Sequence, residues 1–187
     1  MKPFDIDLES YSIRLISDQE EVPAAFTCTS NGLVVVTQQN QPIVVDANDE
    51  VPLFFGVKGK MLTGKAYSVN ESIRERPLID FGNLIERLRL NKDEIEVYLG
   101  PSLTFSHIEQ ADEVLARVIK LGYNLAAKGT SGKHYLDHQL LVCLQMRKLG
   151  IPMEHIHMSS YDTYDTAALK SALRGDNEKN RFVAVLR

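Results

Sequence analysis

The stretch YLDHQLLVCLQMRKLGIPMEHIHMS, residues 135–159, decides the fold class. Its first part repeats apolar residues at helical spacing and then reaches Gly150 and Pro152, a common way for a helix to end. We therefore expect a helix over residues 135–149 and a strand over 155–159. A helix followed closely by a strand is typical of an α/β chain.

Strand and helix patterns alternate along the rest of the chain. We expect strands over residues 11–16, 25–29, 33–37, 43–46, 51–57, 95–99 and 182–186, with a hairpin turn at 30–32. We expect one helix after Pro77, a second that begins near Ser106 and a third over 166–173. Residues 128–133 are expected to form a loop. The predicted fold class is α/β (α+β), a mixed or largely antiparallel sheet packed with helices. No linker divides the chain, so we expect one domain over residues 1–187.

Composition narrows the function classes. The net charge of −4, with both signs mixed along the chain, offers no basic stripe for nucleic acid. Cys28 and Cys143 match no metal-binding or disulfide spacing, which favours a reducing compartment and two small buried residues. No apolar run is long enough for a membrane span, and the first residues lack a signal peptide pattern. We expect a cytoplasmic protein with no nucleic-acid or membrane partner; the sequence does not indicate the oligomeric state.

Residues 59–65, GKMLTGK, have the spacing of a phosphate-binding loop. Ala66 stands where a hydroxyl would meet Mg²⁺, and the residues after it make a poor helix. An ordinary turn is therefore favoured, and a nucleotide-binding loop is the alternative.

Two histidine pairs have spacings that could place both rings on one face. His134 and His138 are four residues apart at the start of the expected helix, and His155 and His157 alternate on an expected strand. Neither pair has a third ligand at a recognised spacing, so we expect no metal site.

Asp162, Asp165 and His157 could act together as acid and base, since carboxylates and imidazoles are common proton-transfer groups. The favoured alternative is that residues 162–165 cap the short helix expected after them. No GxSxG or GxGxxG motif points to a hydrolase or a dinucleotide site.

A series of short motifs runs through the chain in the order typical of one family. They are residues 37–42, 54–59, 100–103, 135–137 and 161–164, and a C-terminal set of Ser171, Arg174, Arg181 and Ala184. In this order the chain resembles the YfiH-like family, also called laccase-domain or multicopper polyphenol oxidoreductase proteins and purine nucleoside phosphorylases. The resemblance covers most of residues 23–187 and implies the family's fold.

The differences from the family concern its metal ligands. The resemblance implies a His, Cys and His set, but Asn40 stands at the Cys position, Phe54 at the second His position, and no histidine precedes His107. Phe has no lone pair and an Asn amide is a poor ligand for zinc or copper. We therefore expect no metal and no other cofactor.

The remaining family positions suggest a ligand site. Lys58, Arg174 and Arg181 stand at arginine positions of the family, and with Asn40 and Ser171 they are the expected ligand-binding residues. Solvated ends of a helix and a strand are the alternative for the two arginines.

Two functions follow from the resemblance. The first is a divergent protein without metal chemistry that binds a small anionic or nucleoside ligand, or a protein partner. The second is a purine nucleoside phosphorylase using Lys58, Arg174 and Arg181, with Asp162 or His107 as the catalytic proton donor. Asn40, Phe54, Lys58 and Arg174 should then surround one cleft.

Overall fold

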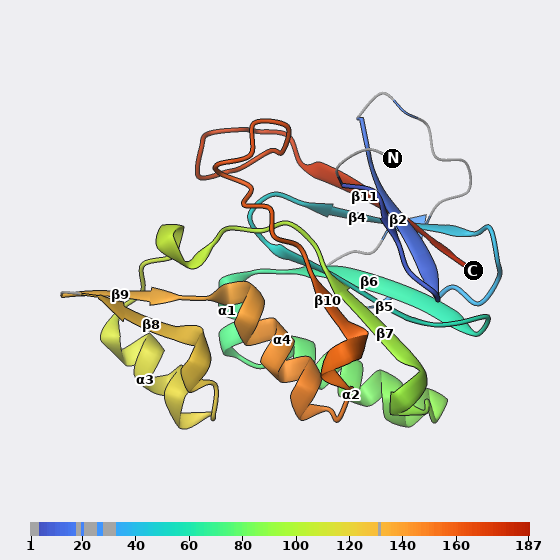
Figure 1. The fold of residues 1–187 in the computed structure, drawn as a ribbon, viewed down its shortest axis with the longest axis horizontal. Helices are drawn as coiled ribbons and strands as arrows, with labels where there is room; N and C mark the ends of the chain where they lie inside the picture. The colour runs from blue at the N-terminus through green and yellow to red at the C-terminus, as the bar shows by residue number, and fades with distance from the viewer. Residues whose placement is uncertain (1–3, 18–19, 21–25, 28–32, 131) are drawn as a thin grey trace.

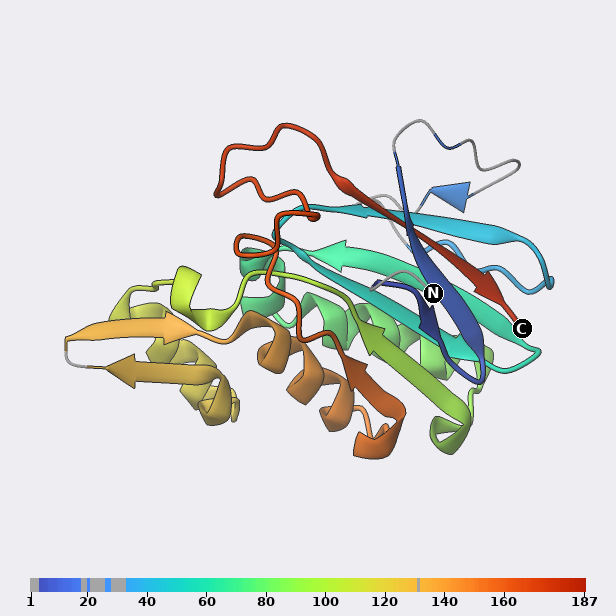
Figure 2. The ribbon, with the colours of Figure 1, turned by 45° about the horizontal axis from the view of Figure 1, so that its top comes forward.

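Two β-sheets lie face to face, and helices cover the outer face of the second sheet (Figures 1 and 2). This computed structural model describes residues 4–17, 20, 26–27, 33–130 and 132–187. Its mixed sheets packed with helices confirm the predicted fold class.

The first sheet has the strand order β1-β2-β11-β4-β3. Its strands are β1 (Ile6–Asp7), β2 (Tyr11–Ile16), β3 (Phe26–Thr27), β4 (Pro42–Ala47) and β11 (Asn180–Leu186). β11 pairs antiparallel with both β2 and β4, whereas β3 runs parallel to β4. Alternate residues of β11, including Phe182 and Ala184, face the core between the sheets.

The second sheet has the order β10-β7-β5-β6. Its strands are β5 (Val51–Val57), β6 (Met61–Tyr67), β7 (Ile95–Leu99) and β10 (Ile156–Met158). β5 is buried on both faces: Leu53 and Phe55 face the helices, and Phe54 faces the first sheet. β10 is parallel to β7, whereas β5 is antiparallel to both of its neighbours.

The helices are α1 (Val69–Ile73), α2 (Arg76–Leu88), α3 (Asp112–Lys120) and α4 (His138–Lys148), with short 3-10 turns η1 (Lys92–Glu94), η2 (Phe105–His107), η3 (Asn124–Ala126) and η4 (Met153–His155). α2 and α4 pack on the second sheet, and α3 packs on α1 and on the β8–β9 hairpin (residues 127–130 and 133–136). The side chain of Asp137 caps α4 by accepting the N–H of Leu140. Within the described ranges no helix is long and apolar enough to cross a bilayer.

The hairpin of β8 (Ala127–Thr130) and β9 (Lys133–Leu136) corrects two predictions. The expected loop at residues 128–133 lies mostly in these strands. The expected helix over 135–149 begins only at His138, because Tyr135 and Leu136 pair across the hairpin with Lys128 and Ala127.

Other expected elements also differ. The second helix begins at Asp112 instead of near Ser106, and residues 33–37 make one isolated bridge, from Val36 to Leu62. Residues 166–173 form turns, so the short helix predicted there is wrong. The hairpin turn expected at 30–32 lies outside the described residues.

The phosphate-loop alternative for residues 59–65 is also wrong. Residues 58–60 form the turn between β5 and β6, and no helix follows the turn. Lys65 lies in β6 with its side chain buried, 3.3 Å from Glu71 and 3.6 Å from Asp80. It therefore balances two carboxylates of the protein and presents no ammonium to a phosphate.

Candidate functional site

The candidate site lies beyond the carboxyl ends of the parallel strands β7 and β10. A parallel bridge between Ser102 and Asp162 continues their pairing, and the N–H of Thr163 donates to the carbonyl of Ser102 at 3.1 Å. The segments that follow the two strands are thus held side by side. Ligands of open α/β sheets commonly bind at the carboxyl ends of parallel strands.

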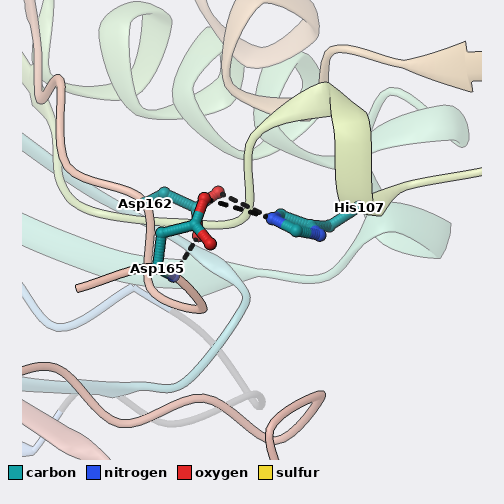
Figure 3. Close-up of side chains that lie close together, drawn as sticks. All are labelled: His107, Asp162 and Asp165. Atoms are coloured by element: carbon teal, nitrogen blue, oxygen red, sulfur yellow. Dashed lines mark hydrogen bonds and ion pairs between the residues drawn. The ribbon is translucent and has the colours of Figure 1, made fainter. Parts of the chain in front are cut away.

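His107, Asp162 and Asp165 converge at this place (Figure 3). The Nε2 atom of His107 lies 3.4 Å from Asp165 Oδ2 and 3.9 Å from Asp162 Oδ2. One donor atom from each of the three residues lies within 4.8 Å of the others, and no second group of this kind occurs among the residues that the structure describes. The two residues expected to be catalytic, His107 and Asp162, are therefore neighbours.

Asp162 is buried and held in the anionic form. Its Oδ2 accepts the N–H of Thr104 at 2.6 Å, and its Oδ1 accepts the N–H of Asp165 at 2.9 Å. Burial raises the pKa of this carboxyl, but hydrogen bonds from the Thr104 side chain and from backbone N–H groups outweigh burial, so the pKa is lowered. Asp162 thus caps a turn and also faces His107; the prediction that residues 162–165 cap a helix is wrong, because no helix follows them.

The aromatic side chain of Tyr164 contacts this polar cluster. The rings of His107 and Tyr164 are in contact at an interplanar angle of 43°, with centroids 4.6 Å apart. Tyr164, Phe105 and Tyr161 are all exposed. Exposed aromatic rings beside a few convergent polar groups are typical of small-molecule sites.

Arg174 lies beside the site but is saturated by the protein. Its Nη1 donates to the carbonyls of Thr163 and Tyr164 at 3.2 and 2.8 Å, its Nη2 donates to the carbonyl of Leu169, and its Nε and Nη2 bind Asp176. These bonds hold residues 163–176 in turns in place of the expected helix. The guanidinium has no direction left for an anion.

Ser171 contributes to the same turns. Its Oγ accepts the N–H of Arg174 at 3.4 Å, and its N–H donates to Asp176 at 2.9 Å. Asp49 closes the arrangement by accepting the Thr163 hydroxyl and the Leu173 N–H at 2.7 and 2.8 Å. Ser171 and Arg174 therefore lie near the site as parts of its framework.

Lys58 lies at the far end of β5. It forms an ion pair with Glu9 at 2.7 Å, whereas Asp49, at the other end of β5, contacts the Arg174 loop. A strand of seven residues spans about 20 Å. Lys58 and Arg174 consequently do not share a cleft.

The other expected positions are also apart. Phe54 is fully buried between the two sheets, and Asn40 is exposed in the turn before β4 with a φ of 64°. Arg181, on β11, forms an ion pair with Asp46 at 3.0 Å. The expected set of Asn40, Phe54, Lys58 and Arg174 therefore does not surround one cleft.

The histidine pairs do not converge. His134 lies on β9 and contacts Asp112, whereas His138 is buried in α4 with its Nε2 2.8 Å from the Ser72 hydroxyl. His155 lines a surface hollow with Lys58 and Glu9, and the Nε2 of His157 lies 3.2 Å from Glu96. His107 thus takes the place next to Asp162 and Asp165 that the sequence suggested for His157.

The sequence matches one protein family, and the structure is similar to solved structures of one fold. The sequence model of the family described as multi-copper polyphenol oxidoreductase laccase matches residues 20–186. No curated protein matches the sequence.

Solved structures with a similar fold include three bacterial proteins. YlmD from Geobacillus stearothermophilus is 18% identical, with a TM-score of 0.74 over 87% of this chain and 69% of that chain. The hypothetical protein YfiH from Bacillus licheniformis is 16% identical, with a TM-score of 0.74 over 92% and 74%. The Neisseria meningitidis protein NMB0706 is 17% identical, with a TM-score of 0.70 over 83% and 64%.

Proposed function

The chain belongs to the multi-copper polyphenol oxidoreductase laccase family, and on that premise we propose that it binds a small nucleoside-type ligand and acts on it by proton transfer. The observation that carries this proposal is the position of His107: its Nε2 faces two carboxylates while its ring packs at a tilt against the exposed Tyr164. A planar base could pack against the exposed Tyr164 ring, and its polar edge would meet ionisable groups.

Charge favours a neutral ligand over an anion. Asp162 and Asp165 give the site negative charge. The cations that follow them in the chain are paired elsewhere, Lys170 with Glu178 and Arg174 with Asp176. An anion would meet repulsion without a free arginine to offset it. Of the ligand classes that the sequence suggests, a nucleoside therefore fits better.

The proton-transfer roles follow from the direction of the imidazole. Both carboxylates face Nε2, so that nitrogen carries the ring N–H in the neutral form and Nδ1 keeps the lone pair. Nδ1 points away from the carboxylates (Figure 3). His107 would accept there a proton from a water that attacks C1′ of the sugar while the glycosidic bond to the base breaks. The anionic Asp162 would stabilise the imidazolium that forms, and the proton would then pass to the leaving base.

The copper chemistry in the family's description does not fit the described residues. Multi-copper sites are built from several histidines, often with a cysteine. Here His107 is joined by two carboxylates, and Cys143 is buried in the core between the second sheet and the helices. We propose that the chain lacks the family's metal-dependent chemistry.

A phosphorylase built on Lys58, Arg174 and Arg181 is less well supported. Such a site needs its cations to converge on one phosphate. Each of the three pairs with a carboxylate of its own, Glu9, Asp176 and Asp46 respectively.

The test is to incubate the pure protein with adenosine or inosine in the presence of EDTA, with and without phosphate, and to follow binding by calorimetry and free base by chromatography. We expect saturable binding, and base release that falls by about 10²-fold or more in His107→Ala. His134→Ala, which removes an exposed histidine that contacts a single aspartate, is the matched control and should match the wild type. Absence of nucleoside binding would refute the proposal, and release only with phosphate would favour the phosphorylase.

A further inference from the structure

We propose that His107, Asp162 and Asp165 form a binding site for a divalent cation of the zinc or manganese class. The site differs from the metal site implied by the family resemblance, because Asn40 and Phe54 take no part in it. It also goes beyond the nucleoside proposal, because binding of the cation requires no ligand.

The spacing of the donor atoms fits a single ion. Two donors about 2.1 Å from one ion are about 3.0 Å apart at a right angle and about 3.4 Å apart at a tetrahedral angle. The His107 Nε2 atom lies 3.4 Å from Asp165 Oδ2 and 3.9 Å from Asp162 Oδ2. The side chain of Asp165 is 67% exposed, so it can move by the few tenths of an ångström needed to reach these donor–donor distances.

Asp162 makes the cluster different from an ordinary group of surface acids. Only 8% of its side chain is exposed, and two backbone N–H groups fix its carboxylate. A rigid, anionic oxygen beside an imidazole nitrogen is a pre-organised half of a metal site.

The charge of the cluster also favours a cation. No lysine or arginine in the described segments forms an ion pair with Asp162 or Asp165; His107 is their ion-pair partner. Arg174, which contacts the same turn, is saturated by Asp176 and by backbone carbonyls. Two carboxylates with one titratable partner leave a negative charge that a divalent ion would balance.

The donor set selects the class of ion. One imidazole nitrogen and two carboxylate oxygens suit zinc and manganese, whereas soft copper prefers thiolates and thioethers. A cation at Nε2 requires the tautomer of His107 that carries its N–H on Nδ1, so the cation replaces the Nε2 proton of the metal-free site.

The test is calorimetric titration of the untagged protein with ZnCl₂ and with MnCl₂ in chelator-free buffer near neutral pH. We expect one site per chain, with affinity lower by roughly tenfold or more in His107→Ala and in Asp165→Asn. Both variants leave the buried Asp162 in place. His134→Ala, which alters a histidine with a single aspartate partner, should bind like the wild type.

A Co²⁺ spectrum supplies a second readout. Binding at this site gives visible d–d bands without thiolate charge transfer, whereas binding at a cysteine gives thiolate charge transfer. Unchanged affinity in both variants, thiolate bands, or no binding at millimolar metal would each overturn the proposal. Nucleoside binding is measured in the presence of EDTA and cation binding in its absence. A negative result for one proposal therefore does not decide the other.

Discussion

Arg174 and His107 show how neighbouring polar residues take different roles. The guanidinium of Arg174 is enclosed by three carbonyls and by Asp176, and so it fixes the turns that carry Tyr164 and Asp165. His107 faces the buried Asp162 and the exposed Asp165, and its Nδ1 points away from both. The first residue supports the site, and the second is placed to do chemistry there.

Arg174→Lys should destabilise the protein and weaken the site at the same time. A lysine cannot make the forked bonds of a guanidinium, so we expect a loss of about 2 kcal/mol in the free energy of unfolding. Urea unfolding measures the loss, and calorimetry measures ligand or metal binding. A variant with unchanged stability would contradict the framework role. Arg181→Lys, on the surface pair with Asp46, is the control and should change stability by less.

His138 should make stability depend on pH. It is fully buried in α4, and burial lowers its pKa to about 4, although the charge of Glu71 opposes this shift. An unfolded histidine has a pKa of about 6.5, so between these values the unfolded chain binds a proton that the folded chain does not. The stability is complete above about pH 6.5 and is lost as the pH falls toward 4.

His138→Gln should remove this dependence. The wild type should lose roughly 3 kcal/mol from this group between about pH 7 and 4, and the variant should lose that much less. Urea unfolding at a series of pH values checks the difference. His157→Gln, at a partly exposed site, serves as the control. Parallel curves for His138→Gln and the wild type would show that His138 does not carry the effect.

At the scale of single elements, β5 is the most constrained strand. It is buried along its whole length, and Gly56 lets the ring of Tyr11 lie directly on its backbone. A Cβ built at Gly56 would lie 2.5 Å from the ring of Tyr11. The Tyr11 hydroxyl then donates to the carbonyls of Phe54 and Glu96 at 3.2 and 3.1 Å, which joins the two sheets.

Gly56→Ala should therefore be strongly destabilising for so small a change. We expect a loss of roughly 2 kcal/mol or more in the free energy of unfolding, because the tyrosine must shift and its hydrogen bonds weaken. Gly129→Ala is the matched control, since its added Cβ would meet its nearest neighbour, the ring of His134, at an ordinary 3.6 Å. Equal effects of the two changes in urea unfolding would rule out the packing explanation.

Elements with a strong local signal could be predicted from the sequence. The alternating or wholly apolar runs at 11–16, 51–57 and 95–99 match strands β2, β5 and β7 residue for residue. The hairpin β8–β9 could not be predicted, because its glycines and polar residues also fit a loop and its last residues fit the start of a helix.

The residues of the candidate site could be predicted from the sequence, but their proximity could not. The residue types of His107 and Asp162 marked them as candidates, but their proximity depends on the parallel pairing of β7 with β10. Local patterns carry no information on that contact between distant segments. The expected anion-binding residues Lys58, Arg174 and Arg181 do not converge. The order of the motifs along the chain carries no information on the sheet that separates Lys58 from Arg174.

At the scale of the whole molecule, the two sheets share one core, and Phe54 lies within it. Its ring packs edge-on against Phe182 of the first sheet, with centroids 6.5 Å apart. The resemblance placed a metal-binding histidine of the family at this position. In this fold the position faces apolar side chains from both sheets.

Phe54→His should destabilise the protein without creating a metal site. We expect a loss of about 3 kcal/mol or more in the free energy of unfolding, since a large ring is lost and a polar group is buried. Phe54→Leu, which stays apolar, should lose less. Urea unfolding and zinc titration check both variants. A stable Phe54→His protein with new zinc affinity would restore the position implied by the resemblance.

The place of β11 between β2 and β4 affects how the chain folds during synthesis. β11 follows every other strand in chain order, yet it is the shared partner of β2 and β4. About 140 residues separate β4 from the end of β11, which a ribosome working at ~5–20 residues per second adds in roughly 7–30 s. For that time the nascent chain carries two apolar strands without the strand that joins them. Chaperones that bind the nascent chain at the ribosome should therefore increase the yield of folded protein more than chaperones that act after release.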